Sequence, residues 1–188
     1  DPLDRRFHAE PLACTACGPA LYWHGRQAIV GNAPALAAAL AGLNGGQIIA
    51  VRGVGGYHLL CDARNEQAVV RLRARKGRPE KPLALMVPWR GRDGLDGARA
   101  LADLSALQAA ALCSARRPIV LAVRSPRAAL APSIAPNLRE IGLMLPYSPL
   151  HHLLLEDFGA ALVATSGNLS GEPVLTEPVD VEARLADV

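Results

Sequence analysis

Short apolar runs alternate with helix-like stretches along most of the chain. Five runs have the length and the aliphatic content of buried strands, at 47–52, 83–87, 119–123, 141–145 and 161–164. The last of them comes directly before a segment rich in hydroxyl and amide groups. Strands that alternate with helices are typical of an α/β fold, in which helices pack on a sheet.

The stretches between these runs carry helix signals. Apolar spacing, helix propensity or a capping residue predicts helices at 33–43, 65–75, 105–113, 149–155 and 180–186. In the second of these, helical spacing predicts that Val69, Val70 and Leu72 point inward. The same spacing predicts that the three arginines between and after them point outward, namely Arg71, Arg73 and Arg75.

Composition indicates one main core. The chain has 188 residues, of which 51% are hydrophobic and 20% are charged, enough for one buried core and short for two independent domains. A net charge of +3 is too small to indicate a nucleic-acid-binding protein by itself. No signal-peptide pattern or membrane-spanning apolar stretch is visible, so a cytoplasmic location is expected.

Residues 1–25 lack clean periodicity and are expected to form an irregular arm. Cys14 and Cys17 make a C-x-x-C pair. A structural zinc site needs four ligands, and His8 and His24 lack the spacing of a zinc finger. The pair is therefore expected to belong to a site whose other ligands lie outside this sequence, and the abrupt start suggests a piece of a longer protein.

A cationic segment follows the second predicted helix. Lys76, Arg78 and Lys81 lie within six residues, and Pro79 and Pro82 prevent a helix from continuing through them. Fixed cations of this kind suit a triphosphate or a carboxyl–phosphate anhydride, because arginine can contact two oxygens and lysine supplies a mobile point charge. The alternative is a solvated basic turn.

A polar segment follows the last predicted strand. Thr165, Ser166 and Asn168 supply hydroxyl and amide groups among glycines, and ligands bind at strand ends in open α/β sheets. The alternative is an ordinary turn rich in serine, asparagine and glycine. The sequence has no Walker A lysine motif, and the glycines at 53–56 do not complete a dinucleotide fingerprint. If the chain binds ATP, it does so without a P-loop.

Four further residues are weaker candidates for chemistry. One of His151 and His152 is expected to be a packed or capping histidine. Cys61 is expected to be a buried small hydrophobe. For Cys113, burial at a helix end is favoured over activation by neighbouring arginines. No Ser-His-Asp order, paired carboxylates or H-E-x-x-H helix is visible.

The two polar segments together resemble the signature of the YrdC-like domains. The residues that carry the resemblance are K-G-R-P-E-K-P-L at 76–83 and T-S-G-N-L-S-G-E-P at 165–173. The resemblance covers about residues 30–188 and implies a twisted mixed sheet with helices packed on it and an open, concave basic surface. It also implies a nucleotide-binding domain, at 26–188, that uses ATP to adenylate a carbamate-type carboxylate.

A second resemblance comes from the flanks. D-P-L-D-R-R at the start, C-T-A-C-G-P at 14–19 and the stretch 138–155 are similar to the HypF family of carbamoyltransferases in nickel–iron hydrogenase maturation. Residues 1–25 would then be the tail of a truncated zinc-finger region. In that family an acylphosphatase domain cleaves carbamoyl phosphate and the YrdC-like domain makes carbamoyl adenylate, releasing pyrophosphate. A further domain passes the carbamoyl group to HypE, on the way to the cyanide ligands of the iron.

The resemblance also implies roles for residues. Lys76 and Arg78 would contact the phosphates as catalytic groups, with Lys81 in support. The nucleotide would be held from the other side by the polar segment through Thr165, Ser166 and Asn168. ATP and Mg²⁺ are the implied cofactors, and Zn²⁺ would bind at Cys14 and Cys17 in the full-length protein.

Three alternatives remain open. Threonylcarbamoyl-AMP synthases, which modify tRNA, share the signature, but this chain has Gly55 and Met86 where groups that receive threonine are expected. A double-stranded RNA-binding module would use a basic face made of Arg71, Arg73, Arg75, Lys76, Arg78 and Lys81. A structural module that only docks neighbouring domains is the third.

Overall fold

The computed structural model describes residues 18–25 and 27–185. The chain divides into two compact units, Asp1–Ala41 and Gly42–Val188. Because Cys14 and Cys17 lie outside the described residues, their proposed zinc site stays a prediction.

The described part of the first unit contains a short β-ribbon. Strands β1 (Tyr22–Trp23) and β2 (Ile29–Val30) pair in antiparallel orientation. Helix α2 (Asn32–Asn44) begins in this unit and ends in the second. The helix predicted at 33–43 is therefore confirmed. The expectation of an irregular arm up to residue 25 is wrong at β1, which is too short to give a periodic signal.

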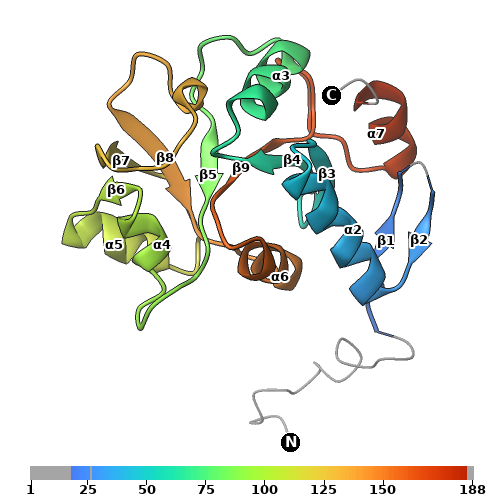
Figure 1. Ribbon diagram of the computed structural model, residues 1–188, viewed down its shortest axis with the longest axis horizontal. Coiled ribbons are helices and arrows are strands. Elements are labelled where there is room, and N and C mark those ends of the chain that lie inside the picture. Colours follow the sequence, from blue (N-terminus) through green and yellow to red (C-terminus); the bar gives the residue numbers. More distant parts are fainter. Residues whose placement is uncertain (1–17, 26, 186–188) are drawn as a thin grey trace, which may run out of the picture. The chain divides into compact units, whose positions relative to one another are not determined.

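A seven-stranded mixed sheet forms the second unit (Figure 1), in the order β3-β4-β9-β5-β8-β7-β6. Strands β5 and β8 pair in parallel, and the other neighbouring strands pair antiparallel. The strands are β3 (Ile49–Gly53), β4 (Gly56–Asp62), β5 (Ala84–Met86), β6 (Ala102–Asp103), β7 (Val120–Arg124), β8 (Glu140–Met144) and β9 (Leu162–Ser166). The predicted α/β mixed sheet is confirmed, and all five predicted strands are present.

Helices cover the sheet. They are α3 (Glu66–Lys76), α4 (Asp96–Arg99), α5 (Ala106–Cys113), α6 (Pro149–Phe158) and α7 (Pro178–Leu185), with a short 3-10 helix η1 (Pro132–Ile134). Together with α2, these include every helix that the sequence predicts. The turn at 53–56 joins β3 to β4 as a tight hairpin, since Gly53 and Gly56 pair with each other.

The sheet separates α3 from α6. Leu59 and Cys61 of β4 belong to the buried core with Val69 and Leu72 of α3. Successive strand residues point to opposite faces, so His58 points to the other face, where its ring stacks on His151 of α6. Figure 1 shows α3 and α6 on either side of the central strands.

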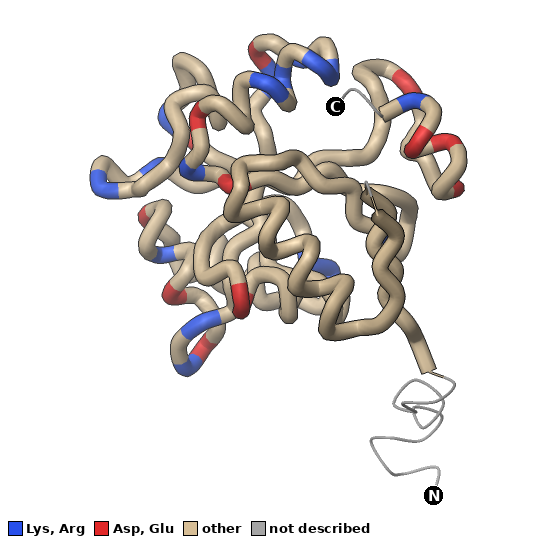
Figure 2. The backbone as a smooth tube through the Cα atoms, turned by 45° about the vertical axis from the view of Figure 1, so that its right-hand side comes forward, with Lys and Arg blue, Asp and Glu red and all other residues tan. Residues whose placement is uncertain are grey.

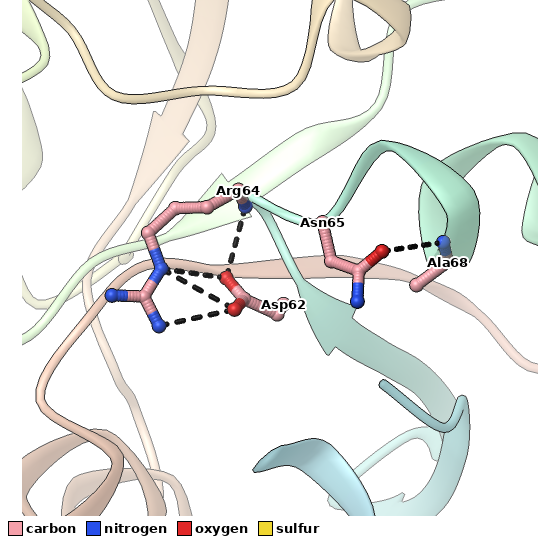
Figure 3. Close-up of polar contacts among 4 residues, drawn as sticks. All are labelled: Asp62, Arg64, Asn65 and Ala68. Carbon is pink, nitrogen blue, oxygen red and sulfur yellow. Dashed lines mark hydrogen bonds and ion pairs between the residues drawn. The ribbon is translucent and has the colours of Figure 1, made fainter. Parts of the chain in front are cut away.

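Local hydrogen bonds fix both ends of α3. At its start, Asn65 Oδ1 accepts a hydrogen bond from the Ala68 amide at 3.0 Å, and Arg64 pairs with Asp62 just before it (Figure 3). At its end, Gly77 has a φ of 61°, a left-handed conformation that favours glycine. The chain therefore leaves the helix directly after Lys76.

The outward face of α3 differs from the predicted one. Lysine and arginine recur along this helix, whereas α2 carries none (Figure 2). Val69 and Leu72 are buried as expected, but Val70 is 47% exposed and Arg73 only 6%. The predicted orientations of Val70 and Arg73 are therefore wrong. Arg73 donates hydrogen bonds to backbone carbonyls at 78–81 and in η1, and helical periodicity cannot reveal such contacts.

Candidate functional site

The cationic and polar segments meet in space at Lys76. Its ammonium group donates hydrogen bonds to the backbone oxygens of Ser166, at 2.5 Å, and Asn168, at 2.7 Å. A third hydrogen bond reaches Asn168 Oδ1 at 3.1 Å. The backbone is joined as well, because the Ser170 amide donates to the Lys76 carbonyl at 3.1 Å. The end of α3 and the loop after β9 therefore form one connected structure.

The loop after β9 is tightly built. Ser166 Oγ donates to Asn168 Oδ1 at 2.6 Å, and Asn168 Nδ2 donates to the Glu172 carbonyl at 2.5 Å. The Gly167 amide donates to the Tyr57 carbonyl at 2.6 Å, and a Cβ on Gly167 would lie 2.8 Å from that oxygen. Glycine at this position thus permits close approach to β4. Thr165 is buried within the strand, with 8% exposure.

Burial sets the electrostatics of Lys76. Its side chain is 2% exposed, and burial, followed by the positive charge of Arg78, lowers the Lys76 pKa to about 8. All three ammonium protons can be used by the three oxygens that it contacts. A phosphate contact by Lys76 would require it to exchange at least one of these bonds, so its first effect is to hold the loop at 166–168.

Arg73 organises the cationic segment. Its guanidinium donates to three backbone carbonyls of that segment, those of Arg78 at 2.9 Å, Pro79 at 3.1 Å and Lys81 at 3.0 Å. It also donates to the backbone carbonyls of Ser133 and Ile134 in η1. Hydrogen bonds from one buried cation to so many carbonyls keep the segment in a single conformation. No sequence motif indicated this role.

Arg78 and Lys81 differ from Lys76 in their surroundings. The Arg78 guanidinium is half-buried and donates to the Pro82 carbonyl at 2.8 Å. Its Nε is buried and has no hydrogen-bond partner among residues 18–25 and 27–185. Burial lowers the pKa of Arg78. Lys81 is exposed. These two cations therefore have donors available for an anion.

A groove opens beside Pro82. Its volume is about 390 Å³, within the range of small-molecule sites. The rest of its lining consists of three apolar side chains, one basic side chain and one acidic side chain, namely Leu121, Val123, Leu138, Arg139 and Glu140. Pro82 thus connects the groove to Arg78, which donates to its carbonyl.

Three aromatic rings meet on the face of the sheet that carries α6. They belong to His58 of β4, Tyr147 in the turn before α6 and His151 of α6. His151 is 1% exposed, which confirms that one of the two neighbouring histidines is packed, while His152 is exposed. Sequence reasoning identified neither His58 nor Tyr147 as a site residue, because only the tertiary fold brings them together.

The cysteines in the described region fall into two environments. Cys61 is fully buried, as predicted, and burial raises its pKa to about 12. Cys113 is exposed, so its expected burial at a helix end is wrong. Cys113 is the last residue of α5 and follows Leu112, the buried residue of that helix. The next position lies about 100° further round the helix and faces solvent here.

Two family profiles match the sequence. The first, described as Telomere recombination and named for Sua5, YciO and YrdC, matches residues 41–188. The chain belongs to the Sua5/YciO/YrdC family. The second profile, the HypF finger, matches residues 1–24. Both resemblances inferred from the sequence, to a YrdC-like domain and to the preceding finger, are confirmed.

Individual relatives agree with this family. Carbamoyltransferase HypF of Rhodobacter capsulatus is 52% identical over 175 residues, which cover 92% of this chain and 22% of the relative. A solved structure of full-length HypF in the phosphate- and nucleotide-bound form is 36% identical, with a TM-score of 0.84 over 100% of this chain and 24% of that one. The chain spans about a fifth of the length of the curated relatives it matches.

The family fold also occurs in more distant structures. YciO of E. coli has a TM-score of 0.70 at 19% identity, and the match covers 83% of this chain and 75% of YciO. At this identity the likeness shows the Sua5/YciO/YrdC fold alone. Among the helices that the structure describes, none has the length and apolar character needed to cross a membrane.

Proposed function

We propose that this chain is the adenylate-forming domain of a longer carbamoyltransferase of the HypF type. It binds ATP, joins carbamate to the adenylyl group and releases pyrophosphate. The observation that carries the proposal is the contact of Lys76 with Ser166 and Asn168, which places the two motifs beside the available cations Arg78 and Lys81. The 52% identity to a carbamoyltransferase HypF supports the choice of reaction.

The triphosphate is assigned to the cationic segment. Arg78 offers a half-buried guanidinium, one nitrogen of which donates to the Pro82 carbonyl, and Lys81 offers an exposed ammonium. Charge-assisted hydrogen bonds to phosphate are strongest where water is partly excluded. Ser166 and Asn168, held by Lys76, face the nucleotide from the other side, with Thr165 behind them in β9. A structure of full-length HypF in a phosphate- and nucleotide-bound form supports nucleotide binding by a protein of this type.

The base is assigned to the groove beside Pro82. Its apolar side chains, Leu121, Val123 and Leu138, suit the faces of a purine, and Arg139 and Glu140 can hydrogen-bond to ribose or base. Because Pro82 lines the groove and its carbonyl binds Arg78, a nucleotide can lie with its base in the groove and its phosphates at Arg78.

The proposed reaction requires that the reactants be positioned and that phosphate charge be neutralised, and it involves no covalent enzyme intermediate. A carbamate oxygen attacks the α-phosphorus of ATP, and the bond from that phosphorus to the oxygen bridging the α- and β-phosphates breaks. Pyrophosphate leaves with the electron pair, and no proton is transferred. Cations at Arg78 and Lys81 offset charge on the leaving phosphates. A closed site also protects carbamate from water.

The described residues do not supply a protein-built metal site. Within 18–25 and 27–185, no group of three histidine, cysteine, aspartate or glutamate side chains could hold a metal ion. Mg²⁺ would arrive with ATP and would supply neutralisation of phosphate charge. Zn²⁺ is assigned to the finger region of the longer protein, with Cys14 and Cys17 among its ligands.

The remaining steps belong to other parts of the longer protein. An acylphosphatase domain supplies carbamate from carbamoyl phosphate, and a transfer domain passes the carbamoyl group to HypE for the cyanide ligands of a nickel–iron hydrogenase. A cytoplasmic location goes with these partners. The RNA-binding alternative is weakened, because two of the six cations in its basic face, Arg73 and Lys76, are buried.

An exchange assay tests the proposal. The 188-residue chain is incubated with ATP, Mg²⁺, labelled pyrophosphate and ammonium carbamate. Because adenylation is reversible, label is expected to enter ATP, and only when carbamate is present. Parallel samples contain bicarbonate alone, or bicarbonate with L-threonine. Binding of a non-hydrolysable ATP analogue is measured on the same preparation.

Any other result of these measurements supports a different function for the chain. Exchange that requires L-threonine assigns the chain to threonylcarbamoyl adenylate synthesis. RNA binding with a steep salt dependence and no ATP binding assigns it to the nucleic-acid class. A chain that binds neither ligand is a structural module, and the proposed function is then wrong.

A further inference from the structure

The His58–Tyr147–His151 cluster is a set of polar groups to which the proposed function assigns no part of the nucleotide. Tyr147 Oη lies 3.0 Å from His58 Nε2. The rings of His58 and His151 stack with centroids 5.7 Å apart, and the Tyr147 ring meets the His151 ring edge-on at 4.6 Å. His58 of β4 is thus joined to two rings from the start of α6 and the segment just before it.

His151 lies at the base of the cluster. It is 1% exposed, and both of its ring nitrogens are buried without a hydrogen-bond partner among the described residues. An unpartnered buried polar side chain costs stability, so its retention requires an explanation. His58 and Tyr147 lie above it and are partly exposed. The cluster therefore combines two partly exposed polar side chains with one that is buried.

The cluster is electrically neutral near pH 7. Burial is the first cause that lowers the pKa of His151, to about 4, and neighbouring charge on His58 or His152 lowers it further. Burial also lowers the pKa of His58 and raises that of Tyr147. Both histidines are then uncharged imidazoles and Tyr147 is an uncharged phenol, so each group can donate one hydrogen bond and accept another.

The sheet places this cluster next to the proposed site. His58 pairs directly with Ser166 across β4 and β9. Side chains of directly opposed residues lie on the same face, with Cβ atoms roughly 5 Å apart. The next positions of this face along the two strands, Leu60 and Ala164, are apolar. The polar groups therefore gather at the end of the face where Ser166 joins the candidate nucleotide loop.

We propose that His58 and Tyr147 bind carbamate and select it as the acceptor of the adenylyl group. The inference rests on the proposed function. Carbamate is small and planar, its two oxygens need donors, and its amino group donates. A neutral imidazole and a phenol beside each other match this mixed demand, whereas a cation would match only the oxygens. A small acceptor suits a position beside three bulky rings and Ser166.

Two conservative substitutions test the subsite. Tyr147→Phe removes one hydroxyl, and His58→Gln keeps hydrogen-bonding capacity while changing its geometry. In the exchange assay with the 188-residue chain, each is expected to raise the KM for carbamate about tenfold, the effect of losing one good hydrogen bond. Affinity for a non-hydrolysable ATP analogue is expected to change less than about twofold, because the nucleotide groups are untouched.

His152→Gln is the matched control. His152 follows His151 on α6 but is exposed, and its ring lies against Trp89 instead of the cluster. The KM of the His152→Gln variant for carbamate is therefore expected to equal that of the wild type. Wild-type exchange with an unchanged KM in both cluster variants would overturn the inference and leave the proposed function standing. Equal losses of ATP and carbamate affinity would also overturn it. Absence of carbamate-dependent exchange in the wild type overturns the proposed function, and this inference with it.

Discussion

Replacing Lys76 by methionine is expected to lower the free energy of unfolding by about 2–4 kcal/mol. Methionine fills similar space, so the loss comes from the three oxygens of Ser166 and Asn168 that the ammonium now satisfies. For a domain of this size the melting temperature would fall by roughly 5–12 °C. Because the loop after β9 also loses its anchor, pyrophosphate exchange is expected to be lost in the same variant.

Arg75→Met is the control for this result. Arg75 precedes Lys76 on α3 and is exposed, so its melting temperature is expected to stay within about 2 °C of the wild type. Thermal unfolding followed by circular dichroism measures both variants under the same conditions. Equal melting temperatures for the two variants would show that Lys76 does not hold the loop, and its burial would then need another explanation.

Replacing Arg78 by glutamine is expected to reduce carbamate-dependent pyrophosphate exchange by about 100- to 1,000-fold, the usual cost of removing a donor that stabilises transition-state charge. The fold is expected to survive, because the Arg78 side chain makes one hydrogen bond within the described part of the chain, to the Pro82 carbonyl. Arg73 holds the same segment independently. Exchange rate and melting temperature are measured on the same samples. This contrast separates Arg78 from Lys76, whose loss affects both quantities.

Arg75→Gln provides the comparison for Arg78. It removes the same charge from an exposed position three residues earlier, so exchange is expected to remain within about threefold of the wild type. If Arg78→Gln behaves like Arg75→Gln, the cationic segment does not contact the triphosphate, and the proposed position of the nucleotide is wrong.

The elements of this fold were predictable because their signals are local. Ser105 is an example, since it caps α5 in a reciprocal arrangement with Gln108. Strand order was not predictable, because the pairing of β4 with β9 and of β5 with β8 joins segments far apart in sequence. The shortest elements, such as β6 and α4, carry too few residues for a periodic signal.

The errors on α3 have a physical cause. Arg73 lies in a row of arginines, which normally face water, so helical spacing predicted that its side chain points outward. Its real partners are carbonyls near η1, including Ser133, which no local rule connects with residue 73. Val70 is exposed because the side of α3 that packs on the sheet is defined by Val69 and Leu72. Tertiary hydrogen bonding thus overrides the charge pattern.

The candidate site, like the fold, was only partly predictable from the sequence. Its two motifs were visible in the sequence, and the structure shows that they touch through Lys76 and Asn168. Their roles in binding ATP stay predictions. The His58–Tyr147–His151 cluster could not be found from sequence, because each ring taken alone has the ordinary interpretation of a packed aromatic residue.

A structure of the chain with α,β-methylene ATP tests the proposed position of the nucleotide. In this analogue a methylene group replaces the oxygen that bridges the α- and β-phosphates, so the bond that adenylation breaks is absent and the nucleotide binds without reacting. The triphosphate is expected in contact with the Arg78 guanidinium and with the loop of Ser166 and Asn168, and the base is expected in the groove beside Pro82. A nucleotide bound elsewhere on the chain, or no binding at millimolar analogue, would contradict this expectation.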